Sequence, residues 1–327
     1  MRRLLTAVVA GSLSLFVVAA PAAAQGTPPP AWPTKPVKII IPFAAGGGTD
    51  IAARHLQPLL QEVLGQPIVI ENKGGGGGIV GTEQLVRSAP DGHTFGMITS
   101  SHASNPALNK DMPYDAIKDV KPVTILFRAT NVWVAHPSSP HKTLADVIAA
   151  AKAAPGKVTV VSSGTGTAQH LGLEQLKLLA GIDVVHVPYR GAGPALQDLL
   201  IGQVQLGILN ISSTLPHVKE GRLRGIAVTS GQRSAYAPDI PSVADIQAGF
   251  DSVEWFAFAA PAGVSDDIVA KFHAAVLKAA QTPKYGEKVK EMGVDLVLNS
   301  TADFKALLAA DVAKFADLVK RANIKLE

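Results

Sequence analysis

The sequence contains no cysteine, few aromatic residues and no cluster of charge. Without cysteine, the chain has no disulfide, no thiolate nucleophile and no residue for an N-terminal lipid anchor. Aromatic residues make up 5% of the chain, and its 30 Lys and Arg are scattered among 26 Asp and Glu. Nucleic-acid binding uses aromatic stacking platforms or a basic patch that follows phosphates. We therefore expect no nucleic-acid partner.

The motifs of common enzyme classes are also missing. There is no Gly-x-Ser-x-Gly, and the nine histidines form no His-x-His or His-x-x-x-His pair for a metal. The glycine run Gly74–Gly78 is not followed by the Lys-Ser/Thr of a phosphate-binding loop. If the chain forms two lobes, we expect this run to pack close to the other lobe or to the hinge. We predict no cofactor, no metal and no catalysis; an exported hydrolase or lyase acting on a carboxylate is the weaker alternative.

The N-terminus has the pattern of a secretory signal peptide. Arg2 and Arg3 precede an apolar run, and Ala22-Ala23-Ala24 supplies the small residues of a cleavage site. An uncleaved membrane anchor is disfavoured, because the run is marginal in length and no basic cluster follows it. We expect cleavage before Gln25 and a soluble, non-lipidated protein in the periplasm. The remaining roughly 300 residues suit two lobes better than one core.

From Val37 onward, short apolar runs alternate with amphipathic helical patterns, which predicts parallel α/β sheets. The expected strands are 37–43, 68–70, 94–98, 123–127, 132–135, 158–161, 184–187, 206–209, 226–229 and 254–260. The expected helices are 50–64, 82–87, 144–154, 168–180, 194–201, 266–280 and 302–320.

Each half of the chain opens with a strand, a glycine loop and a helix. The first loop contains Gly46, Gly47 and Asp50, and the second is the segment 163–167. Such a turn presents unpaired backbone N–H groups at the positive end of a helix, where an anion binds. Ordinary tight turns are the competing interpretation for both loops. For Asp50 we favour a helix N-cap over a ligand contact.

Several polar residues follow other predicted strands and are candidates for the same cleft. Ser100 and Ser101 come after 94–98, and Arg128 after 123–127. Arg190 and Asn210 follow two strands of the second half. Ligands bind at the carboxyl edge of open α/β sheets, and arginine clamps carboxylates, although either arginine is equally compatible with an exposed charge. His170 is a candidate ligand contact or a structural histidine.

These segments together resemble the substrate-binding proteins of tripartite tricarboxylate transporters, also called the Bug family. The resemblance runs from about Trp32 to the C-terminus. The segments that carry it are 32–43 with Gly46, Gly47 and Asp50, 65–72, 89–92, 163–166 with His170 and Leu171, 186–191 with 194–196, 215–217 and 227–230. Ala44-Ala45, Leu209, Ser100–Ser101 and Arg128 depart from the family pattern.

The resemblance implies a type II periplasmic-binding-protein fold with two α/β lobes and a hinged ligand cleft. We expect residues 1–24 as signal peptide, 25–128 with 254–327 as the first lobe and 129–253 as the second. The ligand would be a small carboxylate, such as a dicarboxylate or an aromatic acid. The partners would be the membrane subunits of the transporter, with a sensor or two-component receptor as the alternative, and the protein would be a monomer. The expected ligand-binding residues are Phe43, Ala44, Gly46, Gly47, Asp50, Ser100, Ser101, Arg128, Ser163, Gly164, Thr165, Gly166, Thr167, His170, Arg190 and Asn210.

Overall fold

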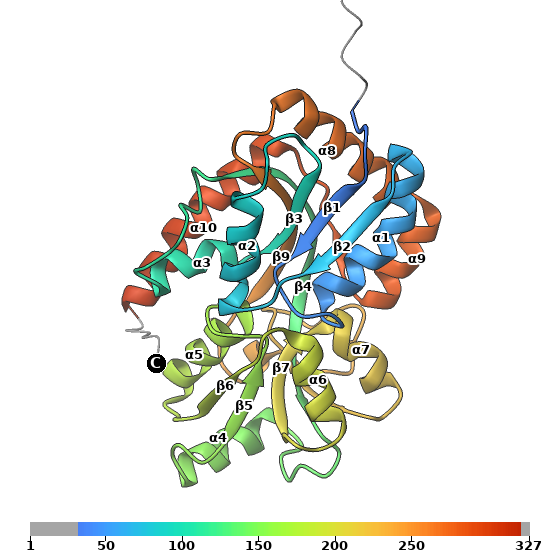
Figure 1. Ribbon diagram of the computed structural model, residues 1–327. Coiled ribbons are helices and arrows are strands. Elements are labelled where there is room, and N and C mark those ends of the chain that lie inside the picture. The colour runs from blue at the N-terminus through green and yellow to red at the C-terminus, as the bar shows by residue number, and fades with distance from the viewer. Residues whose placement is uncertain (1–31, 322–327) are drawn as a thin grey trace, which may run out of the picture. The chain divides into compact units, whose positions relative to one another are not determined.

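The structure is a computed structural model that describes residues 32–321 (Figure 1). The predicted signal peptide and the residues that follow it up to residue 31 lie outside the described residues, as do residues 322–327. The strands are β1 (Val37–Ile41), β2 (Ile68–Asn72), β3 (Thr94–Thr99), β4 (Val120–Ala135), β5 (Thr159–Ser162), β6 (Val185–Pro188), β7 (Leu206–Asn210), β8 (Arg224–Val228), β9 (Val253–Pro261) and β10 (Asp295–Leu296). The helices are α1 (Gly48–Leu64), η1 (Gly76–Gly78), α2 (Ile79–Val86), α3 (Ser101–Leu108), α4 (Leu144–Ala153), α5 (Ala168–Ala180), α6 (Ala192–Leu200), α7 (Ile211–Lys219), η2 (Val243–Asp245), α8 (Asp266–Ala280), α9 (Pro283–Met292) and α10 (Thr301–Arg321).

The strands form two sheets that are joined through β4. Their order is β2-β1-β3-β9-β4-β7-β5-β6, and β8 and β10 also pair with β4. β4 pairs antiparallel with β9 as far as Thr130, and from Asn131 onward it pairs with β7. Figure 1 shows the consequence, which is two α/β lobes with β4 running from one into the other. The helices α8, α9 and α10 return to the lobe that contains β1.

Both faces of the first sheet are buried, which explains the continuous apolar runs of its strands. Ile39 and Ile41 of β1 belong to the core on one face, while Ile40, between them, belongs to the core on the other. Successive strand residues point to opposite faces, so a strand covered on both sides needs apolar residues throughout. On the first face, Phe95 stacks on Phe272 of α8 with ring centroids 3.7 Å apart.

Most predicted elements are confirmed, but the expectation of parallel sheets holds only in part, because β4 and β9 pair antiparallel with their neighbours. The segments 123–127 and 132–135 are one strand, β4, because the less apolar residues between them cross from one lobe to the other. The helices α3, α7 and α9 were not predicted. Their sequences are polar or interrupted by proline, as with Pro106 in α3 and Pro216 in α7. Packing therefore outweighs local helix propensity there, and α7 and α9 also have side-chain N-caps.

Candidate functional site

A small cavity lies where the two lobes meet. Its wall consists of Phe43, Gly47, Gly48, Thr49, Ser163, Gln169, Ala192, Asn210, Glu254 and Phe256. Its volume is about 20 Å³, room for roughly one water molecule. The lobes are therefore closed on each other, and a larger ligand enters only when they separate.

Four helices begin at this cavity. Gly48 and Ala192 are the first residues of α1 and α6, Gln169 lies in the first turn of α5, and Asn210 is the N-cap of α7. The first N–H groups of each helix have no intrahelical acceptor, and the helix dipole is positive at this end. Since the four helix ends meet at one small space, the cavity is electrostatically suited to an anion. The sequence predicted two such helix ends, at the first and second glycine loops.

Asp50 organises the first glycine loop. The expected N-cap role is wrong, because the N-cap is Gly47 and Asp50 lies in the first turn of α1. The Asp50 carboxylate accepts hydrogen bonds from the Gly46 N–H, the Arg54 Nε and the Asn72 amide, all at 3.0 Å. Burial raises its pKa, but the bonds from Arg54, Gly46 and Asn72 together lower the pKa below the ordinary value. Asp50 therefore shapes the loop and does not line the cavity.

Replacing Asp50 by Asn is expected to destabilise the protein by about 2 kcal/mol, because hydrogen bonds to a charged acceptor are stronger than neutral ones. The loss should appear in chemical denaturation at neutral pH and shrink as the pH falls below the ordinary aspartate range, where the carboxylate protonates. The exposed Asp111→Asn is the control. An Asp50→Asn protein as stable as the control contradicts this role.

The second glycine loop is held by Thr167. The Thr167 side chain accepts from the His170 N–H at 3.4 Å and donates to the Gly164 carbonyl at 2.7 Å. Gly164 and Gly166 have φ of 138° and 81°, conformations that favour glycine. Of this loop, Ser163 lines the cavity, whereas Gly164, Thr165, Gly166 and Thr167 do not.

Removing the Thr167 hydroxyl should cost about 1–2 kcal/mol of stability, the usual loss for an N-cap threonine. We expect Thr167→Ala to lower the free energy of unfolding by that amount in urea titrations, while Thr167→Ser restores most of it. Equal destabilisation by both changes assigns the effect to the lost methyl group and contradicts a capping role.

His170 has a structural role in this arrangement. Its Nδ1 accepts from the Gly166 N–H at 3.2 Å, and its ring stacks on His186 with centroids 4.2 Å apart. Burial lowers the pKa of His170 to about 4 and that of His186 to about 3, so both rings are neutral at physiological pH. His170 thus supports the second loop from behind, and it does not line the cavity.

Glycines allow the lobes to touch. A Cβ atom on Gly193 would lie 1.9 Å from the Ala45 carbonyl oxygen, and one on Gly77 would lie 2.0 Å from that of Thr165. The Ala44 N–H donates to the Arg190 carbonyl at 3.0 Å. The approach of Gly77 to Thr165 confirms that the glycine run Gly74–Gly78 packs close to the other lobe.

The remaining polar candidates lie away from the cavity. The Arg190 side chain is exposed, and only its backbone reaches the other lobe. Arg128 is also exposed, in a separate hollow with Tyr236 and Asp295. Its neighbour Ala129 pairs with Glu254, so Arg128 points to the opposite face of the sheet. Ser100 and Ser101 are buried at the start of α3, next to the end of β3 as expected.

Sequence reasoning missed Gly48, Gln169, Ala192, Glu254 and Phe256, all of which line the cavity. Glu254 is 3% exposed, and its Oε2 accepts from the amides of Gln169 at 3.0 Å and Asn210 at 3.4 Å. A lone carboxylate inside the apolar run of β9 was the signal available, because an ionisable group in such a strand requires a compensating partner.

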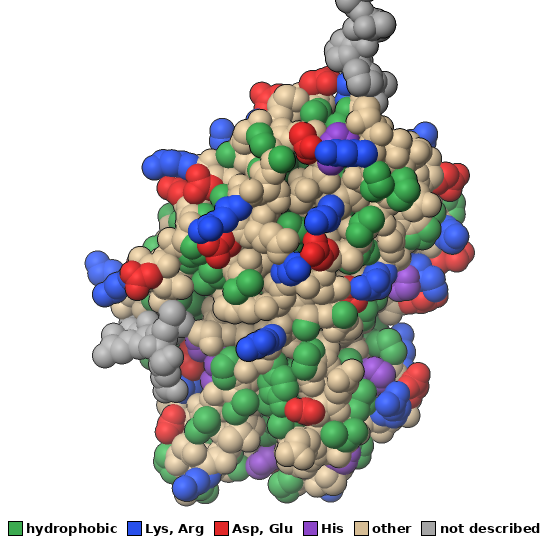
Figure 2. All heavy atoms as spheres, in the orientation of Figure 1, with side chains coloured by type: hydrophobic (Ala, Val, Ile, Leu, Met, Phe, Trp, Pro, Cys, Tyr) green, Lys and Arg blue, Asp and Glu red, His purple; other side chains and the backbone are tan. Residues whose placement is uncertain are grey.

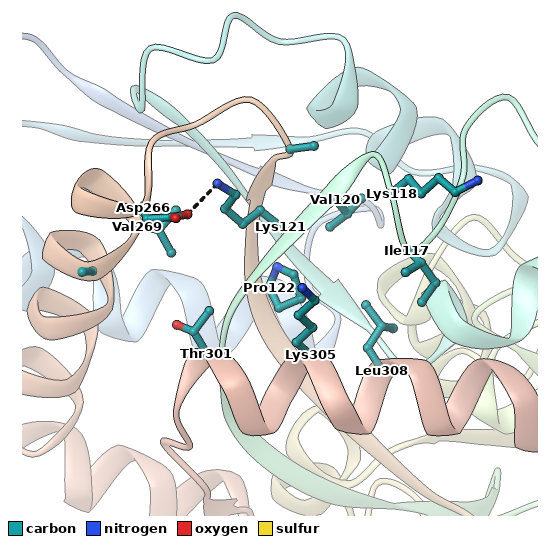
Figure 3. A pocket seen from close by; sticks show the side chains of 12 residues that line it. Ile117, Lys118, Val120, Lys121, Pro122, Asp266, Val269, Thr301, Lys305 and Leu308 are labelled. Atoms are coloured by element: carbon teal, nitrogen blue, oxygen red, sulfur yellow. Dashed lines mark hydrogen bonds and ion pairs between the residues drawn. The ribbon is translucent and has the colours of Figure 1, made fainter.

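Larger hollows lie elsewhere on the protein. One of these hollows has a volume of about 430 Å³ and is lined by Lys118, Lys121 and Lys305 together with apolar side chains such as Val120 and Leu308 (Figure 3). The Lys121 ammonium is paired with Asp266 at 2.8 Å. The face in Figure 2 carries interspersed charges of both signs. Within residues 32–321 no cluster of side chains suits a metal ion, and no helix is long and apolar enough to cross a membrane.

The sequence profile of the tripartite tricarboxylate transporter family receptor matches residues 52–324. The chain belongs to this family. This membership confirms the resemblance that its loop motifs indicated.

Several solved structures superimpose closely on this chain. The periplasmic binding protein BugD has 29% identity and a TM-score of 0.87, covering 90% of this chain and 100% of that chain. Rpa4515 of R. palustris, solved with adipate, has 31% identity and a TM-score of 0.85, covering 90% and 99%. MatC from Rhodopseudomonas palustris, with bound malate, has 29% identity and a TM-score of 0.83, covering 88% and 100%. The predicted two-lobed binding-protein fold is thereby confirmed.

Proposed function

We propose that this protein is a periplasmic solute-binding protein that captures a small carboxylate between its lobes for the membrane subunits of a tripartite tricarboxylate transporter. The observation that carries the proposal is the meeting of four helix N-termini at one interlobe cavity. The backbone N–H groups at these helix ends are hydrogen-bond donors at the positive ends of the helix dipoles. A carboxylate is a negatively charged acceptor and is therefore suited to bind there. The adipate and malate bound by two similar proteins support the same ligand class.

In this proposal the carboxylate contacts the cavity wall formed by Gly47, Gly48, Thr49, Ser163 and Asn210. Phe43 and Phe256 provide apolar surface for the carbon chain. Among the described residues, the proposed lobes comprise 32–128 with 254–321, and 129–253. Residues 1–24 would direct export, and the protein would act by binding without chemical conversion.

A thermal-shift experiment tests the proposal. Protein that has been unfolded and refolded to remove bound ligand is heated with aliphatic mono-, di- and tricarboxylates, amino acids and aromatic acids. A ligand that binds only the folded protein at 100 times its Kd stabilises it by about 2.7 kcal/mol, which raises the midpoint by several degrees. A shift with one chemical class is the expected result. No shift with any member of the panel contradicts carboxylate capture.

A further inference from the structure

Glu254 carries the sole ionisable side chain among the residues that line the cavity, and no lysine or arginine lines it within the described part of the chain. It comes from β9, next to Phe256, which also lines the cavity. An uncompensated carboxylate at an anion site would repel the ligand. Its position therefore calls for an explanation beyond the capture of a simple carboxylate.

The surroundings of Glu254 leave it one free acceptor position. A carboxylate accepts about four hydrogen bonds. The amides of Gln169 and Asn210 donate to its Oε2, and the Thr99 hydroxyl is a third hydrogen-bonding partner. Gln169 is itself fixed, because its Nε2 also donates to Asn131 Oδ1 at 2.7 Å and its Oε1 accepts from Ser163 at 2.9 Å. The network holds the carboxyl group at the cavity wall with capacity for one more donor.

We propose that Glu254 selects carboxylates that carry a hydrogen-bond donor, a hydroxyl or an ammonium group, beside the captured carboxylate. The inference rests on the proposed function, because it assigns the second contact of the same ligand. The helix N-termini bind the ligand's carboxylate, and Glu254 accepts from the neighbouring donor. A second carboxylate at this position would instead meet a like charge with no lysine or arginine in the cavity wall to neutralise it.

The electrostatics of Glu254 agree with this role. Burial raises its pKa to about 7, against the hydrogen bonds from Asn210, Gln169 and Thr99, which lower it. A donor supplied by the ligand favours the ionised form, and an ammonium group does so more strongly than a hydroxyl. Sites built to bond a polar ligand group discriminate against the analogue that lacks it, because the protein group is then left unpaired.

Two matched sets of probes test the proposal by isothermal titration calorimetry at pH 8. Succinate, malate and aspartate differ by one hydroxyl or one ammonium group, as do propionate, lactate and alanine. We expect the native protein to bind a substituted member of at least one set about 10- to 100-fold more tightly than the unsubstituted member. Glu254→Gln should abolish the preference for the amino acid and leave succinate bound as tightly or more tightly. Glu220→Gln, which changes an exposed side chain, should alter neither the preference for the amino acid nor the affinity for succinate.

The outcomes separate the two proposals. Equal binding of all members of both sets, or tighter binding of the unsubstituted ones, overturns the role of Glu254 and leaves carboxylate capture intact. An unchanged preference in Glu254→Gln also overturns it. The absence of binding by every probe overturns the role of Glu254, and the thermal-shift panel then decides carboxylate capture on its own. If Glu254→Gln fails to fold, the affinity ratios of the native protein still decide.

Discussion

Gly193→Ala is expected to weaken carboxylate binding about 10- to 100-fold without lowering the stability of the ligand-free protein. Gly193 lies in α6, and a Cβ atom there would lie 1.9 Å from the Ala45 carbonyl oxygen and 3.0 Å from its carbon. Ala45 belongs to the first lobe, so the added methyl group obstructs closure and leaves the second lobe undisturbed. Overpacking against backbone typically costs 1–3 kcal/mol, which gives the stated loss of affinity. Within the helix, alanine is favoured over glycine by roughly 1 kcal/mol.

A matched control is available in α9. Gly286 is also helical, but a Cβ atom there would meet nothing within 4 Å. Gly286→Ala should therefore leave the Kd unchanged. Calorimetric titration of both variants with the best carboxylate, and thermal unfolding without ligand, provide the comparison. If Gly193→Ala retains native affinity, closure of these two loops is not part of binding.

The second large effect concerns the pH dependence of stability through Glu254. Its pKa rises from 4.5, the value for the unfolded chain, to about 7 in the fold because the side chain is buried. Between these values the folded protein binds more protons than the unfolded one, so this residue lowers the stability as the pH rises from about 4.5 to about 7. The full contribution is about 3 kcal/mol.

Glu254→Gln should remove this contribution. Relative to the native protein, the variant should gain stability progressively from pH 4.5 to pH 7 and remain constant above that. The difference between the two proteins is the informative quantity, because His102, His170 and His186 have lowered pKa values and make the stability rise with pH over much of the same range. Urea titrations of both proteins at several pH values measure this difference in the free energy of unfolding. A difference that does not vary with pH shows that Glu254 is ionised in both states.

The sequence was sufficient for the fold and for the general position of the site. Apolar runs buried on both faces of a sheet predicted the strands, and glycine loops before helices marked the first two helix ends. These features are local, because strand periodicity and the backbone requirements of a turn depend on a few consecutive residues. The continuity of β4 through its polar middle was not predictable in this way.

The composition of the cavity wall depends on contacts between distant segments. Whether Arg128 or Glu254 reaches the cavity is decided by strand alternation and by the pairing of β4 with β9. Gln169 faces the cavity and its neighbour His170 packs behind the loop, a distinction that follows from the pitch of α5 and the position of the lobes. Neither predicted arginine side chain lines the cavity, since residue type alone does not set side-chain direction.

The central claim is that helix N-termini at the interlobe cavity hold the carboxylate, and a crystal structure of the complex with the tightest-binding acid tests it most directly. We predict that the ligand's carboxylate oxygens lie within hydrogen-bonding distance of the backbone N–H groups of Gly48 or Thr49 and of Ser163, so that both lobes contact the ligand. A carboxylate bound instead by Arg128, or by the lysines of the hollow in Figure 3, would contradict the claim.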